Sequence, residues 1–149
     1  MPLDPSYVGR SYPPAEPYLV SREKIREFAD AIGDPNPAYR DPQAARKLGH
    51  PDVIAPPTFP MVITAASTQQ LLFDPELGLD YGRMVHGEQR FVHARPIRAG
   101  DRLAPGLTVE SIRSIAGNEI LGTRIDLHDQ DGELVATGYA TLIVRGPEG

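Results

Sequence analysis

One stretch without a charged side chain, FPMVITAASTQQLLF at residues 59–73, most constrains the fold of this chain. It is longer than an ordinary strand and rich in good helix formers, so it predicts a helix that begins near Pro57 or Thr58. A helix with so few charges is expected to be buried. The rest of the chain must therefore supply a surface that covers it.

The C-terminal half supplies that surface as strands. The pattern becomes strand-like over 84–94, 103–115, 120–128 and 134–144, and within 120–128 one face carries Leu121, Thr123, Ile125 and Leu127. Turn sequences separate these ranges at 98–101 (RAGD), 116–119 (AGNE) and 130–133 (QDGE). Asp131-Gly132 is a strong hairpin signal, and Pro105-Gly106 indicates an edge or a bulge. One apolar helix against an antiparallel meander predicts an α+β fold.

The N-terminal third is organised differently. Residues 1–17, rich in Pro and Tyr, predict an extended arm, and 18–20 a short strand. Ser21 is a suitable N-cap for an amphipathic helix over 22–32 that ends at Gly33, and Asp41-Pro42 opens a short helix over 42–48. The length suits a single domain over residues 1–149.

Composition excludes several classes of function. Lys and Arg total 15 against 20 Asp and Glu, a net charge of -5 without a basic block, which argues against a nucleic-acid partner. There is no cysteine, and His50, His93 and His128 lack metal-ligand spacing, so we expect no metal. Neither a signal peptide nor a span of ~20 apolar residues is present, which predicts a cytoplasmic protein with no membrane partner.

The segment GDPNPAYRDP, residues 33–42, holds the candidate chemistry. Asp34 and Asn36 lie in a turn fixed by prolines, and Tyr39 follows five positions after the aspartate. A tyrosine titrates near ~10 and is a poor base at neutral pH, whereas a histidine near ~6.5 can accept and return a proton. The alternatives are a helix end followed by an ordinary turn, with Tyr39 as a packed aromatic side chain.

Four motifs carry a resemblance to a known family: AIGDPNPAY at 31–39, APPTF at 55–59, VHGEQRF at 85–91 and RPIRAGD at 95–101. Together they resemble the MaoC-like hot-dog family of (R)-specific enoyl-thioester hydratases and dehydratases. The chain is most similar to the N-terminal halves of two-domain members and to the non-catalytic subunits of heterodimeric (3R)-hydroxyacyl-carrier-protein (ACP) dehydratases. The resemblance implies a single hot-dog fold, in which a long antiparallel sheet wraps around a central apolar helix.

The resemblance also implies roles for particular residues. Active members pair an aspartate with a histidine five residues later; Asp34 matches the aspartate and Tyr39 replaces the histidine, which leaves a degenerate catalytic pair. Active members also carry His-Gly before the central helix, where this chain has Ala55-Pro56, and proline has no N–H for an oxyanion. The residues expected to bind the substrate are Asn36, Pro57, Thr58, His86 and Gly87. For His86, a purely structural role in a strand is the alternative.

Three functions follow from this resemblance. The first is a subunit of a hydro-lyase of fatty acid metabolism, which acts on thioesters of CoA or ACP with no other cofactor. Such a subunit would supply the acyl pocket and the dimer interface to a partner with an intact Asp/His pair, and would be weak or inactive alone. The second is a self-sufficient homodimer, either a hydratase that uses Asp34 with His86 or Tyr39, or a thioesterase. The third is a non-enzymatic acyl-CoA-binding module. A dimer is expected in the first two because a lone hot dog leaves a sheet edge unpaired.

Overall fold

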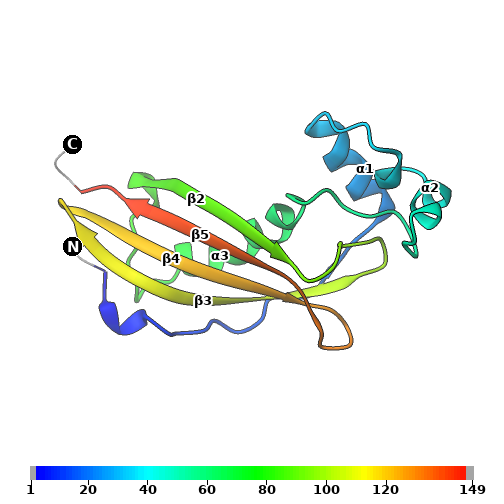
Figure 1. Cartoon of the computed structure of the whole chain (residues 1–149). Helices are drawn as coiled ribbons and strands as arrows, with labels where there is room; N and C mark the ends of the chain where they lie inside the picture. Colours follow the sequence, from blue (N-terminus) through cyan, green and yellow to red (C-terminus); the bar gives the residue numbers. More distant parts are fainter. Residues whose placement is uncertain (1–2, 147–149) are drawn as a thin grey trace.

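A curled antiparallel sheet dominates the structure, a computed structural model that describes residues 3–146 (Figure 1). Its strands are β1 (Tyr18–Leu19), β2 (Met84–His93), β3 (Arg102–Ile115), β4 (Asn118–His128) and β5 (Leu134–Val144), in the order β1-β3-β4-β5-β2. Every pairing is antiparallel. Buried Leu121, Ile125 and Leu127 alternate along β4 on the face turned to the core. This confirms the predicted α+β hot-dog arrangement.

Helix α3 (Pro60–Leu72) lies on the concave face of this sheet (Figure 1). It begins later than predicted, because Phe59 donates its N–H to the Pro56 carbonyl at 2.9 Å and closes a separate turn before the helix. Only one side of α3 is buried: Ile63, Ser67 and Leu71 face the core, whereas Ala65 and Ala66 are exposed. The predicted burial of this helix is therefore confirmed for one side of α3 only.

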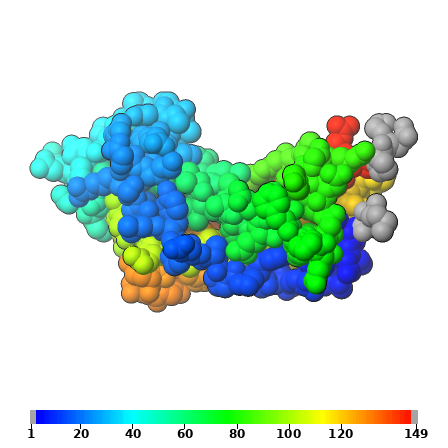
Figure 2. All heavy atoms as spheres, turned by 180° about the vertical axis from the view of Figure 1, so that it is seen from behind, coloured from blue at the N-terminus to red at the C-terminus, as the bar shows by residue number. Residues whose placement is uncertain are grey.

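The first helices form a separate lobe beyond one end of the sheet (Figures 1 and 2). Helix α1 (Arg22–Ala31) starts at Ser21, whose hydroxyl accepts from the Lys24 N–H at 3.1 Å, and is followed by Gly33 at φ 73°. Helix α2 (Pro42–Lys47) follows its Asp41 cap as predicted. Figure 2 shows a hollow in the surface between this lobe and the green region that contains α3.

The N-terminal arm covers one edge of the sheet. After a short 3-10 turn, η1 (Pro5–Tyr7), the arm runs along β3, where Gly9, Tyr12 and Ala15 donate backbone N–H groups to carbonyls of β3 at 2.8–3.1 Å. The Tyr12 hydroxyl donates to Asp74 Oδ2 at 2.7 Å and ties the arm to the loop after α3. The opposite edge, strand β2, is terminal in the sheet and carries no such cover within residues 3–146.

The β3–β4 hairpin gives a direct test of turn chemistry. Ile115 pairs with Asn118, which leaves a two-residue loop in which Ala116 has φ 52° and Gly117 φ 83°. Asn-Gly suits this turn better than Ala-Gly because asparagine tolerates positive φ. We expect Ala116→Asn to raise the free energy of unfolding by about 0.5–1 kcal/mol in urea titrations. Ala116→Val is the opposite control, since a β-branched residue should lower that free energy.

Candidate functional site

Asp34 and Asn36 are both engaged in the turn that leaves α1. The Asp34 N–H donates to the Ala29 carbonyl at 2.9 Å, and its Oδ1 accepts from the Asn36 N–H at 3.1 Å. Asn36 Oδ1 in turn accepts from the Ala38 N–H at 3.0 Å and caps the 3-10 turn η2 (Pro37–Tyr39). The side chains thus hold the backbone that carries Tyr39.

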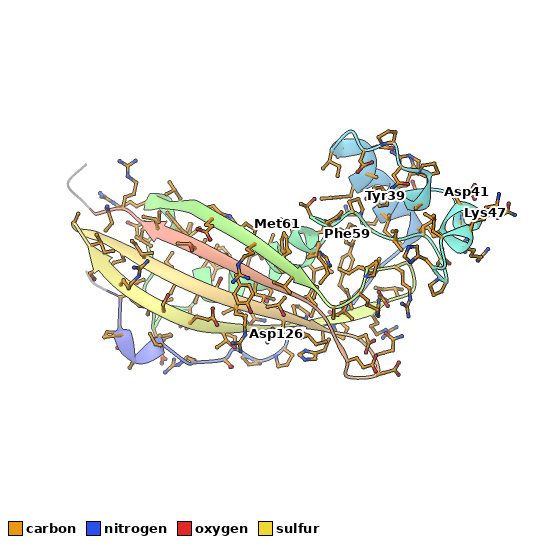
Figure 3. The ribbon with its side chains drawn as sticks, viewed as in Figure 1. Tyr39, Asp41, Lys47, Phe59, Met61 and Asp126 are labelled. Atoms are coloured by element: carbon orange, nitrogen blue, oxygen red, sulfur yellow. The ribbon has the colours of Figure 1, made fainter. Side chains whose placement is uncertain are left out.

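Tyr39 lies in the N-terminal lobe (Figure 3) and is buried, with 7% of its surface exposed. Burial raises the pKa of its hydroxyl, and the negative charge of Asp34 raises that pKa further, while the Asn36 side chain acts weakly in the opposite direction. The phenol therefore stays protonated at neutral pH. It can donate a hydrogen bond but is a worse base than an unperturbed tyrosine.

Tyr39 and Pro57 line one cavity of about 380 Å³, here called the lobe pocket. Its walls come from the N-terminal lobe, the stretch before α3 and the end of β2: Tyr39, Ile54, Ala55, Pro57, His93, Ala94, Arg95 and Pro96. The Ala55 N–H is already donated to the Ile97 carbonyl at 2.7 Å, and the two prolines that follow have none. This wall has no N–H group to offer a thioester oxygen before Thr58.

His93 belongs to the same pocket and was not predicted to have a role. Its Nε2 lies 2.8 Å from the Pro57 carbonyl oxygen, so Nε2 carries the proton and donates. Nδ1 is buried and has no hydrogen-bond partner among the described residues. The contact joins residues 36 positions apart in sequence, which is why no local pattern indicated it.

A second cavity, of about 150 Å³ and here called the helix pocket, lies between α3 and the sheet. It is lined mainly by apolar and small side chains of α3, β2, β4 and β5: Met61, Thr64, Ala65, Thr68, Met84, His86, Gln89, Ile125, Gly138, Ala140 and Leu142. Gly138 permits this close packing, since a Cβ there would meet Phe91 at 3.1 Å and Thr64 at 3.4 Å. The pocket has the character of a space for a short hydrocarbon chain.

His86 lines the helix pocket rather than the lobe pocket. Its Nε2 contacts the Glu88 carbonyl at 3.0 Å, and Gly87 sits at a β-bulge where a Cβ would meet Ile143 Cδ1 at 2.9 Å. His86 and His93 are separated by seven residues of strand, about 23 Å. Within a single copy of the protein, His86 therefore does not lie beside the lobe pocket that Tyr39 lines.

The remaining predicted site residues are more peripheral. Thr58 and Asn36 are exposed, and the Thr58 carbonyl accepts from the Met61 N–H at 3.1 Å at the start of α3. Asp34 is half-buried beside the lobe pocket's Tyr39. The structure thus brings Asp34, Asn36, Tyr39 and Pro57 into one region and leaves His86 and Gly87 in another.

Two negative findings concern residues 3–146. That range contains no group of three or more His, Cys, Asp or Glu side chains placed to hold a metal ion. None of the helices described there has the length and apolar character to cross a bilayer.

The curled sheet around one apolar helix, with a pocket between them, defines a protein with a single hot-dog fold. The family described as FAS1-like, dehydratase domain region, matches residues 6–138. The chain belongs to this family of MaoC-like dehydratases, as its motifs predicted.

Relatives that align with nearly the whole chain carry the name UPF0336. The UPF0336 protein SCO4636 of Streptomyces coelicolor is 60% identical over 148 residues, 99% of each chain. The UPF0336 protein of Saccharopolyspora erythraea is 52% identical over 153 aligned positions, which cover 100% of this chain and 98% of the relative.

Among solved structures, a MaoC-like dehydratase superposes with a TM-score of 0.88 at 34% identity and covers 96% of this chain. The present chain accounts for only 43% of the length of that dehydratase. A chain of the C-terminally truncated HadBC (3R-hydroxyacyl-ACP dehydratase) complex from Mycobacterium tuberculosis superposes at 0.81, with 35% identity, over 92% of this chain and 96% of its own length.

Proposed function

We propose that this protein is the non-catalytic subunit of a (3R)-hydroxyacyl-thioester dehydratase. It contributes part of the acyl pocket and the dimer interface to a second hot-dog subunit with an intact Asp/His pair. The substrate is an acyl thioester of CoA or of an acyl carrier protein.

The observation that carries this proposal is Tyr39. Dehydration of a 3-hydroxyacyl thioester needs a group that takes the C2 proton and one that protonates the leaving hydroxyl. Tyr39 stands where active members have histidine, and both burial and Asp34 raise its pKa, which keeps it protonated. The protonated hydroxyl can donate a hydrogen bond, but it cannot take the C2 proton at neutral pH.

The stretch before α3 supports the same conclusion. The transition state places negative charge on the thioester oxygen, and backbone N–H groups normally stabilise it. Here the Ala55 N–H is occupied by Ile97, and Pro56 and Pro57 have no N–H. This chain therefore lacks a good base at position 39 and free backbone N–H donors at positions 55–57, and the reaction requires both kinds of group.

The two sheet edges support a dimer. The arm hydrogen-bonds along β3, whereas β2 is left as the terminal strand, with Val85 and Val92 44% and 49% exposed. An uncovered edge strand is a site for pairing with another chain. His86 and Gln89 on β2 line the helix pocket, so a partner strand at this edge would lie beside that pocket.

The test is hydration of a trans-2-enoyl thioester, followed by loss of the conjugated-thioester absorbance. The purified protein alone is expected to show no turnover above background. A mixture with a catalytic hot-dog subunit is expected to be at least about 100-fold more active than either subunit alone.

Two variants sharpen this test. Asp34→Asn in this chain should leave the mixture's rate within about threefold, because its Asp34 does no proton transfer in the proposed complex. Replacement of the partner's catalytic histidine should abolish the rate. Robust turnover by the lone protein that falls on Asp34→Asn would instead establish a self-sufficient hydratase.

A further inference from the structure

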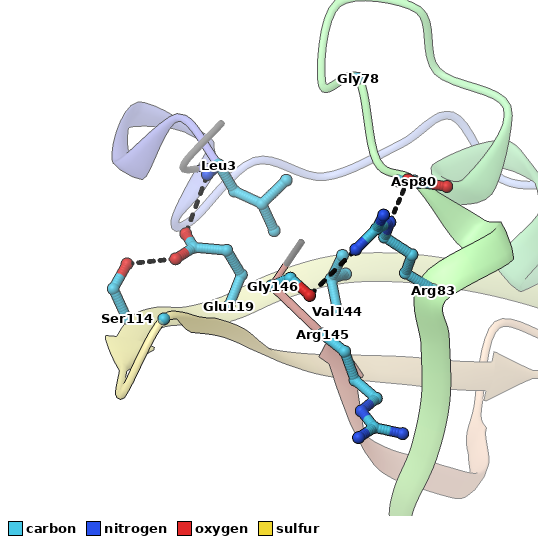
Figure 4. A pocket seen from close by; sticks show the side chains of 10 residues that line it. Leu3, Gly78, Asp80, Arg83, Ser114, Glu119, Val144, Arg145 and Gly146 are labelled. Carbon is cyan, nitrogen blue, oxygen red and sulfur yellow. Dashed lines mark hydrogen bonds and ion pairs between the residues drawn. The ribbon is translucent and has the colours of Figure 1, made fainter. Parts of the chain in front are cut away.

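A third cavity lies at the end of the sheet opposite the N-terminal lobe. This end pocket measures about 550 Å³ and is formed by the β3–β4 hairpin, the end of β5 and the loop before β2 (Figure 4). Its charged side chains are largely satisfied locally: Glu119 accepts from the Leu3 N–H at 2.9 Å and from the Ser114 hydroxyl, and Arg83 donates to the Gly146 carbonyl at 3.0 Å. Leu3 and Val144 give it an apolar wall.

The helix pocket and the end pocket are neighbours along the inner face of β2 and β5. His86 and Leu142 are cross-strand partners, and both line the helix pocket. The next inward-facing pair is Met84 and Val144, of which Met84 lines the helix pocket and Val144 the end pocket. Successive inward residues of a strand are about 7 Å apart. The boundary between the two cavities therefore runs through the Met84–Val144 pair.

Met84 is the adjustable member of that pair. It is half-buried, and the residue before it, Arg83, already belongs to the end pocket. Methionine is unbranched and changes rotamer easily, whereas valine is stiff at χ1. A change of the Met84 rotamer would open a passage between the two cavities, whereas the stiff Val144 side chain cannot move aside in this way.

The volumes of the two cavities indicate which acyl chains need this passage. A cavity of about 150 Å³ accommodates a molecule the size of benzene, so the helix pocket holds about six carbon atoms. A longer acyl chain that enters it must displace Met84 and continue into the end pocket, whose 550 Å³ is ample for the additional carbon atoms.

We infer that Met84 is a specificity-determining residue that sets the acyl chain length by closing the passage from the helix pocket to the end pocket. This inference rests on the proposed function, because it takes the helix pocket to be an acyl site. Chains of up to about six carbons bind with Met84 in place, and longer ones bind only when it moves.

The test compares chain lengths in the complex of this protein with a catalytic hot-dog subunit. The measured quantity is kcat/KM for trans-2-hexenoyl and trans-2-dodecenoyl thioesters. Met84→Ala is expected to raise the ratio of dodecenoyl to hexenoyl about tenfold, and Met84→Phe to lower it. Met61→Ala is the matched control: it removes the same side chain from the same pocket, on α3 rather than at the boundary, and should leave the ratio within about twofold.

A second measurement separates this inference from the proposed function. Binding of hexanoyl- and dodecanoyl-pantetheine to the protein alone, by titration calorimetry, should show the same shift for Met84→Ala. An inactive complex with the shift in binding would overturn the proposed function but keep Met84 as the gate of an acyl site. An unchanged preference in Met84→Ala, or an equal change in Met61→Ala, would overturn the gate.

Discussion

Replacement of Asp101 by asparagine is expected to lower the free energy of unfolding by about 3 kcal/mol. Asp101 is 3% exposed. Its carboxylate accepts hydrogen bonds from both terminal nitrogens of Arg95 at 2.9 Å and from the Arg98 N–H at 3.0 Å. Asparagine keeps the shape of the side chain but leaves the Arg95 guanidinium with a single carboxylate among the described residues, Asp129 at 3.3 Å, beside its hydrogen bond to the Pro96 carbonyl. The lower end of the 3–5 kcal/mol range for a broken buried pair applies because Arg95 retains some contact with water.

The measurement is urea denaturation followed by circular dichroism, with the slope against urea expected to stay constant. Asp131→Asn is the matched control, since it removes the same charge from an exposed position in the β4–β5 hairpin, and it should change the free energy by less than about 0.5 kcal/mol. Equal values for the two variants would mean that the Arg95 cluster, formed by Arg95 with Asp101 and Asp129, does not stabilise the fold.

The Arg95 cluster also shows why some features could not be predicted from sequence. Arg83, Arg90, Arg95 and Arg98 are close in the chain, which by itself suggests a shared surface. Strand alternation and the following turn separate them instead. Arg90 stacks on Tyr139 with its guanidinium 4.0 Å from the ring centre, Arg95 is held by buried carboxylates, and Arg83 lies at the end pocket.

Features set by local chemistry were predicted well. The caps at Ser21 and Asp41 and the hairpin at Asp131-Gly132 depend on neighbouring residues, and the elements beside them have nearly the predicted bounds. The start of α3 depends instead on a turn from Pro56 and on the contact of Ala55 with Ile97, 42 residues away. In the same way, His93 contacts Pro57 because the end of β2 lies beside the stretch before α3 in the folded chain.

The same distinction between local and distant contacts applies to the candidate site. The family motif identified Asp34 and Tyr39, and the structure places them in one region because they are joined by a single short turn. The motif could not show that His86 lines a different cavity from the one that Tyr39 lines. That separation depends on which end of a ten-residue strand lies under the lobe.

A restored catalytic pair gives the largest expected change in activity. Tyr39→His places an imidazole beside Asp34, and general acid–base catalysis contributes roughly 10²–10⁴-fold. The single variant should nevertheless stay near background, because Pro56 still denies an N–H to the thioester oxygen. Pro56→Gly restores the glycine of the family's His-Gly pair, and an oxyanion donor is worth roughly 10²–10³-fold.

We therefore expect Tyr39→His with Pro56→Gly to hydrate a trans-2-enoyl thioester at least about 100-fold faster than Tyr39→His alone. The control is Tyr39→Phe with Pro56→Gly, which changes the loop identically and supplies no acid or base. Addition of Asp34→Asn to the active pair should return the rate to background. If Tyr39→His alone were as active as the double variant, the proline would not be a second defect. A folded but inactive double variant would mean that the turn holding Asp34 to the Asn36 N–H does not orient its carboxylate for proton transfer.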